Sequence, residues 1–295
     1  DLVLAIGPRL GEMTTSGYTL LEAPRPKQAL VHVHAGIEEL GRVYQADLMI
    51  ASGMPEIAAA LRGVRVDASA WAGSLAQARA EYEAWQGRPA IYAGGAAPAL
   101  DLWELVQTLK RLLPADAILT NGAGNFATWA NRFWPYAGLR TLLSTTSGSM
   151  GYGVPAAVAA KIAAPDRMVV SFAGDGCFLM NGQDFATAVQ YDLPVIVIVV
   201  DNGMYGTIRM HQEREYPGRV SATTLKNPDF AAYAKAFGGH GERVEKTSEF
   251  AAAFERAVKS GKPAIIHCLL DPEAITPAKS LSTIRAEAFA AQKKD

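Results

Sequence analysis

Two short polar motifs follow apolar segments of this sequence and could together hold a divalent cation. Gly174-Asp175-Gly176 follows the apolar run 168–173, and Asp201-Asn202-Gly203 follows the apolar run 194–200. A carboxylate and a carboxamide offer the hard oxygen ligands that suit Mg²⁺, which usually keeps other positions for water and phosphate. The flanking glycines allow a tight turn and a close approach of a ligand to the backbone. The pattern therefore predicts a Mg²⁺ site that can also take a phosphate group.

The basic residues of the chain avoid this region. No Lys or Arg occurs between Arg167 and Arg209. A phosphate bound there would have to be neutralised by a metal ion and by helix N-termini. The sequence also contains neither GxxxxGKS nor GxxxxGKT, which argues against a P-loop. The structural alternative is that Asp175 caps a helix and Asn202 fills a turn, but the pairing of two motifs at successive strand ends favours a binding site.

A third glycine-rich segment supports a competing interpretation. Gly151, Gly153 and Ala156 fit the dinucleotide fingerprint GxGxxG/A, and Asp175 lies near the position at which a ribose-binding acid would follow. A nicotinamide-dependent dehydrogenase is therefore an open alternative. It does not explain Asn202 or the glycines on both sides of Asp175.

The elements that would position these motifs alternate between strands and helices. In residues 98–295 the apolar patterns predict strands at 117–120, 168–173, 194–200 and 264–270, and helices at 101–113, 155–162, 183–191, 230–237 and 248–260. Such alternation predicts a doubly wound α/β domain with a parallel sheet, in which ligands bind beyond the carboxyl ends of the strands. One crossover separates the strands that end before Asp175 and Asp201, so we expect these strands to be neighbours.

The preceding residues are predicted to form a smaller unit and a linker. Residues 1–70 show strands at 2–6, 29–33 and 47–52 and helices at 36–44 and 55–61, a pattern that predicts part of a Rossmann-like α/β domain. Residues 71–97 begin with an Ala-rich helix over 71–85 and end in glycine and proline, a composition typical of a linker. The boundary is placed near Ala97.

Composition and charge exclude several classes of protein. The chain has 295 residues, 49% of them hydrophobic and 19% charged, with a formal net charge of −1. This near-neutral charge gives no electrostatic footprint for nucleic acid. The longest apolar run, 195–200, is too short for a membrane span of about 20 residues. Two cysteines cannot form a disulfide framework, so we expect a cytoplasmic protein. The chain begins at Asp1, directly before an apolar strand, and we expect a piece of a longer polypeptide.

Taken together, the motifs resemble the diphosphate-binding domain of thiamine diphosphate enzymes, with acetolactate synthase catalytic subunits as the most similar group. The family motif is GDG, about two dozen residues, and then NN. Here Gly174-Asp175-Gly176 is followed by 24 residues and then by Asp201-Asn202. Asp201 replaces the first Asn of the family, whereas Asn202 matches the second, which is the metal ligand. The resemblance covers most of residues 98–290 and, more weakly, residues 1–61, which resemble the second half of the family's middle domain. It therefore implies a partial middle domain over residues 1–70.

The resemblance implies a role for each matching residue. Asp175, Asn202 and the main-chain carbonyl of Met204 would hold Mg²⁺. Met150 would lie beneath the cofactor and bend it, with main-chain groups of Gly148 and Met150 at the pyrimidine ring. Considered alone, Met150 would be a core residue. The full set of cofactor-binding residues that the resemblance implies is Gly124, Asn125, Gly148, Met150, Gly174, Asp175, Gly176, Cys177, Asn202, Met204 and Tyr205. Cys177 is expected there as a small buried residue and not as a nucleophile.

Several positions depart from the family pattern. Asn125 and Phe126 stand where the family has Gln and His in GQHxxW. His211, a possible substrate contact, stands where acetolactate synthases have a Trp that selects the second oxo acid. Residues 31–37 lack the acidic, Pro-containing turn that meets the ribose of FAD, so the sequence gives no firm ground for FAD. His32 and His34 lie in that stretch and are expected to be ordinary strand-face histidines and not a metal pair.

The implied activity is thiamine diphosphate- and Mg²⁺-dependent decarboxylation of a 2-oxo acid, followed by acyl transfer to a second carbonyl. The alternatives are a simple thiamine diphosphate-dependent decarboxylase or lyase, the dehydrogenase, and a non-catalytic module. No residue of this chain matches the Glu that the family carries on a separate pyrimidine-binding domain. We therefore expect these 295 residues to carry half of an active site and to be inactive alone, with the full-length protein a homodimer or homotetramer.

Overall fold

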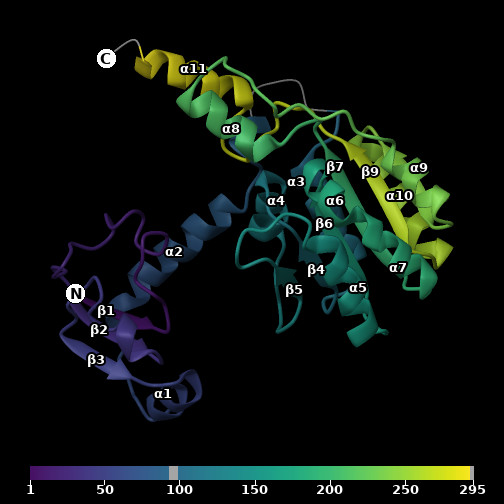
Figure 1. Cartoon of the computed structure of the whole chain (residues 1–295). Coiled ribbons are helices and arrows are strands. Elements are labelled where there is room, and N and C mark those ends of the chain that lie inside the picture. Colours follow the sequence, from purple (N-terminus) through teal and green to yellow (C-terminus); the bar gives the residue numbers. More distant parts are fainter. Residues whose placement is uncertain (93–98, 293–295) are drawn as a thin grey trace. The chain divides into compact units, whose positions relative to one another are not determined.

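The computed structural model describes residues 1–92 and 99–292 (Figure 1). The chain divides into two compact units, Asp1–Ala78 and Arg79–Asp295. The predicted glycine- and proline-rich end of the linker, with the boundary near Ala97, lies outside the described residues. None of the helices in the described ranges is both long and apolar enough to cross a membrane.

The first unit is a small parallel sheet in the order β1-β2-β3. Its elements are β1 (Leu2–Ile6), β2 (Ala29–His34), the 3-10 helix Ile37–Glu39, β3 (Leu48–Ala51), α1 (Met54–Leu61) and the 3-10 helix Ser69–Trp71. The three predicted strands are confirmed. The predicted helix over 36–44 is wrong beyond its first turn, because Leu40 is extended and Gly41 has a φ of 77°. Both conformations are incompatible with a continuing α-helix. Helix α2 (Ala72–Trp85) follows.

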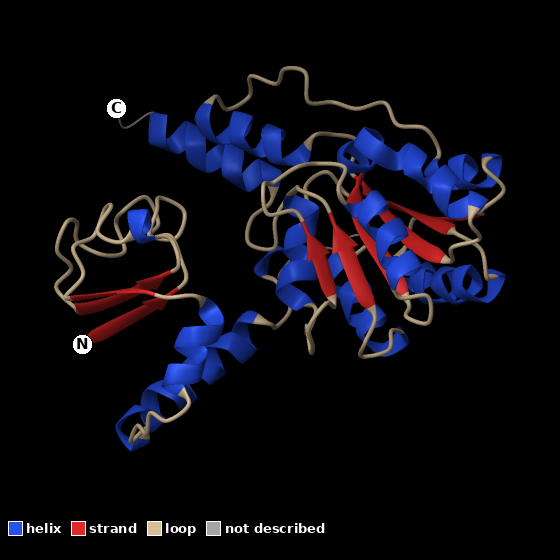
Figure 2. Ribbon diagram, turned by 60° about the horizontal axis from the view of Figure 1, so that its bottom comes forward, coloured by secondary structure: helices blue, strands red, loops and turns tan. Residues whose placement is uncertain are grey.

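The second unit contains a six-stranded sheet in the order β5-β4-β6-β7-β9-β8, and every pairing in it is parallel. The strands are β4 (Ile118–Asn121), β5 (Leu142–Ser144), β6 (Val169–Gly174), β7 (Val195–Asp201), β8 (His240–Val244) and β9 (Ala264–Leu269). Helices cover both faces of this sheet (Figure 2). The predicted doubly wound α/β fold is confirmed.

The helices of the second unit include the five that were predicted over residues 98–295 and several that were not. The described helices are the 3-10 turn Ala90–Tyr92, α3 (Leu102–Leu112), α4 (Asn125–Phe133), α5 (Gly153–Ala163), α6 (Asp175–Asn181), the 3-10 turn Gly182–Asp184, α7 (Phe185–Gln190), α8 (Gly206–Glu215), α9 (Phe230–Ala236), α10 (Thr247–Ser260) and α11 (Leu281–Gln292). Helices α4, α6, α8 and α11 were not predicted. Helices α4 and α6 begin at the predicted site residues Asn125 and Asp175, and α8 begins directly after Tyr205, so polar and glycine residues obscured the apolar periodicity of these three.

Strand β7 shows why this sheet forms. All seven of its residues are buried, as in a parallel strand covered on both faces. Ile196, Ile198 and Val200 belong to one core cluster, which also includes residues of α3, α4 and α10. Val197 and Val199 point to the other side and pack with residues of α6 and α9. This alternation within a continuous apolar run fixes the strand at the centre of the sheet.

Helix α11 is held against α8 by a buried carboxylate. Glu213 of α8, only 1% exposed, accepts hydrogen bonds from Arg285 Nε at 2.8 Å and from Arg285 Nη2 at 2.7 Å. It also accepts from Arg209 Nε at 2.9 Å, from Arg209 Nη2 at 2.7 Å and from the main-chain N–H of Gly218 at 2.8 Å. These charged hydrogen bonds hold the pKa of Glu213 well down, to about 2, with Arg285 as the largest cause. Glu213 thereby links α8 to α11 through Arg285.

Candidate cofactor-binding site

The two polar motifs meet at one edge of the sheet. Strands β6 and β7 are hydrogen-bonded neighbours, and their register pairs Gly174 with Val200. Asp175 therefore follows one strand and Asp201 ends the other at the same carboxyl edge. The expectation that these strands are adjacent is confirmed. Asp175 is also the first residue of α6, so the strand end and the helix start bring the carboxylate to this edge.

A cavity lies at this edge. Its lining includes every residue that the resemblance gave as cofactor-binding: Gly124, Asn125, Gly148, Met150, Gly174, Asp175, Gly176, Cys177, Asn202, Met204 and Tyr205. His211 is absent from the lining and is exposed on α8. The cavity is also lined by residues that sequence reasoning missed, among them Leu270, Ala274 and Ile275. Leu270 directly follows β9, so the rule that ligands bind beyond strand ends could have found it.

Three oxygen donors in the cavity suit a hard cation. Asp175 is 3% exposed, and its Oδ2 accepts a hydrogen bond from Asn227 Nδ2 at 2.8 Å. Asn202 Oδ1 accepts from the N–H of Met204 at 3.3 Å, which holds the amide oxygen in place. Among the described residues, no main-chain N–H donates to the carbonyl of Met204. A carboxylate, an amide oxygen and a carbonyl are ligands that Mg²⁺ takes together with phosphate oxygens. The residues present therefore fit Mg²⁺.

The composition of the site disfavours zinc. In the ranges 1–92 and 99–292, no group of three or more His, Cys, Asp and Glu side chains is placed to hold a metal ion. Zinc sites take several nitrogen or sulfur ligands of that kind. The donor set at Asp175 contains oxygen only, so the site favours an oxygen-loving cation.

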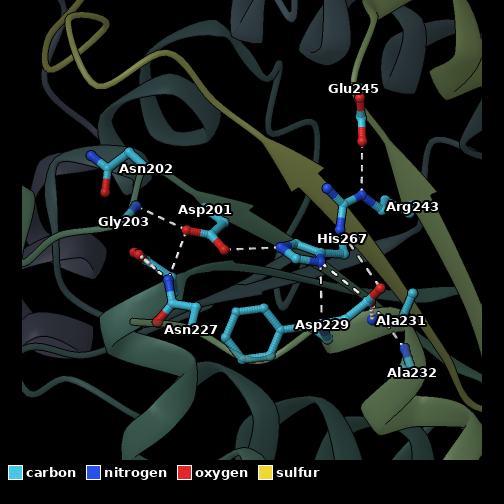
Figure 3. A network of polar contacts seen from close by, with 12 residues as sticks. Asp201, Asn202, Gly203, Asn227, Asp229, Ala231, Ala232, Arg243, Glu245 and His267 are labelled. Carbon is cyan, nitrogen blue, oxygen red and sulfur yellow. Dashed lines mark hydrogen bonds and ion pairs between the residues drawn. The ribbon is translucent and has the colours of Figure 1, made fainter. Parts of the chain in front are cut away.

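A second carboxylate, that of Asp201, belongs to a hydrogen-bonded group with Gly203, Asn227 and His267 (Figure 3). Asp201 Oδ1 accepts hydrogen bonds from Asn227 Nδ2 at 2.7 Å and from the N–H of Gly203 at 2.9 Å. Asp201 Oδ2 lies 2.9 Å from His267 Nε2. The amide nitrogen of Asn227 thus bridges Asp175 and Asp201. Sequence reasoning missed Asn227 and His267, because both lie far along the chain from the two motifs.

The two carboxylates have opposite pKa shifts. Burial is the largest cause at Asp175 and raises its pKa to about 7, with a further rise from the neighbouring Asp201. Burial also acts to raise the pKa of Asp201, but the hydrogen bonds from His267, Gly203 and Asn227 outweigh it, so that pKa is lowered. Asp201 is thus the carboxylate whose charge is satisfied within the protein, and Asp175 is the one whose charge is left for a ligand.

Comparisons with known proteins agree with this geometry. Residues 122–268 match the family described as "Thiamine pyrophosphate enzyme, C-terminal TPP binding domain", thiamine pyrophosphate being another name of thiamine diphosphate. The chain is 30% identical over 275 residues to the acetolactate synthase isozyme 2 large subunit of Escherichia coli. It is 30% identical over 288 residues to the acetolactate synthase large subunit of Corynebacterium glutamicum.

This chain belongs to the thiamine diphosphate-dependent enzymes. The matches cover 92% of the chain but 48% of the Escherichia coli protein, and 93% of the chain but 45% of the Corynebacterium protein. The chain therefore spans about half the length of the curated relatives it matches. In sequence, the chain is similar to the large subunits of acetolactate synthases.

The loop that carries Met150 packs closely on the start of α6. The N–H of Gly151 donates to Cys177 Sγ at 3.2 Å, and Cys177 is buried. A Cβ on Gly122 would lie 2.3 Å from that sulfur, and a Cβ on Gly151, whose φ is 82°, would lie 2.8 Å from Met180 Cβ. Burial raises the pKa of the Cys177 thiol, which keeps it protonated and poorly nucleophilic. Cys177 is confirmed as a small buried residue.

Asn125 and Phe126, which replace the Gln and His of the family pattern, are both well packed. Thr207 Oγ1 accepts from the N–H of Asn125 at 2.9 Å and donates to Asn125 Oδ1 at 3.1 Å, which joins the starts of α4 and α8. The ring of Phe126 lies beside Gly174, where an added Cβ would come within 2.6 Å of it. Phe126 therefore fills space beneath the cavity and brings no hydrogen-bond donor, so Asn125 is the polar group that this segment offers.

The dinucleotide interpretation does not fit the sheet order. Gly153 begins α5, but the strand before it, β5, pairs with β4, whereas β6 lies on the other side of β4. In a dinucleotide-binding unit the strand before the fingerprint and the strand that carries the acid are neighbours. Asp175 is therefore not placed as a ribose-binding acid of that unit.

The two strand histidines of the first unit bond to nearby main chain. His32 Nε2 lies 3.0 Å from the carbonyl oxygen of Pro8, and His34 Nδ1 lies 2.9 Å from the amide nitrogen of Gly36. Their ring centroids are 6.2 Å apart. Both histidines therefore make hydrogen bonds to the main chain beside strand β2.

Proposed function

We propose that the intact protein catalyses thiamine diphosphate- and Mg²⁺-dependent decarboxylation of a 2-oxo acid and transfers the acyl unit to a second carbonyl. The observation that carries this proposal is the cavity at the β6–β7 edge, where Asp175, Asn202 and Met204 bring three oxygen donors beside Gly148 and Met150. The names of the relatives support the acetolactate synthase-like character of the reaction.

In this proposal the chain's residues bind and orient. Asp175, Asn202 and the carbonyl of Met204 would hold Mg²⁺, and Asn125 would add a polar contact for the cofactor at the start of α4. The chemistry that thiamine diphosphate would supply when bound is a nucleophilic carbon and a sink for the electron pair that departing CO₂ leaves behind. Met150 would support the cofactor, and Tyr205 would contact the cofactor or the substrate. Because few charged side chains line the cavity, Mg²⁺ and helix N-termini would have to neutralise the phosphates.

The activating Glu is assigned to a pyrimidine-binding domain outside these residues. The relatives are about twice as long as this chain, which leaves room for such a domain in the intact protein. We therefore propose that these residues alone bind the cofactor weakly and do not turn over. We further propose a homodimer or homotetramer in the cytoplasm, consistent with the two free, buried cysteines. The proposal does not include FAD as a cofactor.

Calorimetric titration with thiamine diphosphate, with and without Mg²⁺, tests the cofactor site. We expect binding that requires Mg²⁺ and is lost in Asp175→Ala. Asp166→Ala is the matched control, because Asp166 is exposed and precedes the opposite end of β6. Binding of NADH in place of thiamine diphosphate, by both this chain and the intact protein, would instead favour the dehydrogenase.

A simple decarboxylase or lyase is the second candidate. The observation that favours it is His211, which is exposed on α8. By the resemblance, acetolactate synthases have at this position a Trp that selects the second oxo acid. Product analysis with a 2-oxo acid, with and without an added carbonyl acceptor, separates the two. Release of an aldehyde at the same rate in both cases would favour the simple decarboxylase.

A further inference from the structure

Asp201, which replaces the first Asn of the family motif, belongs to a larger hydrogen-bonded group. Both oxygens of Asp201 accept: Oδ1 from Gly203 and Asn227, and Oδ2 from His267. Asp201 is 8% exposed and His267 is 2% exposed, so water has little access to these atoms. Each buried donor therefore depends on the acceptor it has in the protein.

The backbone of α9 sets the tautomer of His267. The N–H of Phe230, the first residue of α9, donates to His267 Nδ1 at 3.3 Å. Asp229 Oδ1 is 3.6 Å from the same nitrogen, beyond hydrogen-bond distance, and already accepts from the N–H groups of Ala231 and Ala232. With Nδ1 as an acceptor, the imidazole proton lies on Nε2 and points to Asp201.

This tautomer explains why position 201 is an acid. An Asn there would have one oxygen and one NH₂ group. If the NH₂ group faced His267, two donors would meet. If it faced Gly203 and Asn227, three donors would meet. Only a carboxylate accepts on both sides, so the proton on His267 and the acid at position 201 require each other.

The same chain of contacts reaches the cation ligand. Asn227 Nδ2 uses its two hydrogens on Asp201 Oδ1 and Asp175 Oδ2. Asn227 Oδ1 is buried and has no hydrogen-bond partner among the described residues. Turning the amide over would gain nothing, because its oxygen would then face two carboxylates. Asp201 therefore fixes the orientation of Asn227, and Asn227 fixes the Asp175 carboxylate.

We propose that His267 is a positioning residue for the cation site, acting through Asp201 and Asn227 on Asp175, and that its Nε2–H is what requires Asp in place of Asn at position 201. This inference rests on the proposed function for the identity of the cation site. Residues behind a metal ligand commonly change metal affinity by about 10- to 100-fold when replaced.

Two variants and their combination test the pairing in the intact protein. Asp201→Asn is expected to weaken Mg²⁺-dependent binding of thiamine diphosphate by about 10-fold or more, measured by calorimetry. In D201N/H267Q the Gln carbonyl can accept from the new Asn, so most of the affinity is expected to return. His267→Gln alone keeps an NH₂ donor for Asp201 and should lose less than D201N. His240→Gln is the matched control, because His240 lies on β8 and bonds to Glu242.

The proton position is tested separately, without cofactor. Nitrogen NMR of protein with labelled histidine, assigned with the His267→Gln variant, is expected to show the His267 proton on Nε2. A proton on Nδ1 alone would overturn the inference, as would a D201N protein that binds as tightly as the unmodified one. If the unmodified intact protein does not bind thiamine diphosphate with Mg²⁺, the proposed function fails, and the NMR result still decides the pairing of His267 with Asp201.

Discussion

Asp175 and Glu213 are both buried acids in the second unit, yet their environments differ in kind. Asp175, 3% exposed, has one amide donor and a second carboxylate nearby, and its pKa is raised to about 7. Glu213, 1% exposed, is surrounded by two guanidinium groups and a main-chain N–H, and its pKa is lowered to about 2. A carboxylate that the protein satisfies fully serves stability. One that it leaves short of partners is available for a ligand.

The Glu213 half of this comparison gives the largest expected effect. Glu213→Gln leaves Arg209 and Arg285 without their shared countercharge at the α8–α11 contact. We expect a loss of about 3 kcal/mol in the free energy of unfolding, as for breaking a buried ion pair. Denaturant titration measures it, with Glu255→Gln on the exposed side of α10 as the control. A loss no greater than that of the control would show that the arginines find other partners.

The same carboxylate gives a pH dependence of known sign. Its pKa in the folded protein, about 2, lies below the ordinary 4.5, so the stabilisation is complete above pH 4.5 and declines as the pH falls toward 2. Between pH 4.5 and pH 3 we expect about 2 kcal/mol of unfolding free energy to be lost through this group. The E213Q variant should lack that part of the decline. Parallel acid profiles for the two proteins would contradict the assignment.

Replacing Asp175 is expected to change the free energy of unfolding least, and to raise it where replacing Glu213 lowers it. With chelator present at pH 8, Asp175→Asn removes a buried charge that the protein does not pair, so the free energy of unfolding should rise by about 1 kcal/mol. Thermal unfolding measures the change, and D166N is the control. A clear destabilisation by D175N would place Asp175 with Glu213 as a structural acid and weaken the distinction between them.

Much of the site could be predicted before the structure. The apolar runs before Gly174 and Asp201 identified two neighbouring strands, and the residues after them carry the oxygen donors of one cavity. Local periodicity was less informative where polar and glycine residues interrupt it. It missed α4, α6, α8 and α11, and it extended a helix through Gly41, whose positive φ cannot be recognised from hydrophobic spacing.

The sequence by itself determined the family, the fold class and the motif residues at the carboxyl ends of β6 and β7, because strand patterns and motif spacing are local properties of the chain. Only the tertiary structure joined Asn227 to Asp175 across 52 residues and His267 to Asp201 across 66 residues. His267 reaches Asp201 because β9 pairs with β7 in the sheet, whereas Asn227 comes from the segment that precedes α9. Which buried acid is satisfied and which is left for a ligand is decided by that packing.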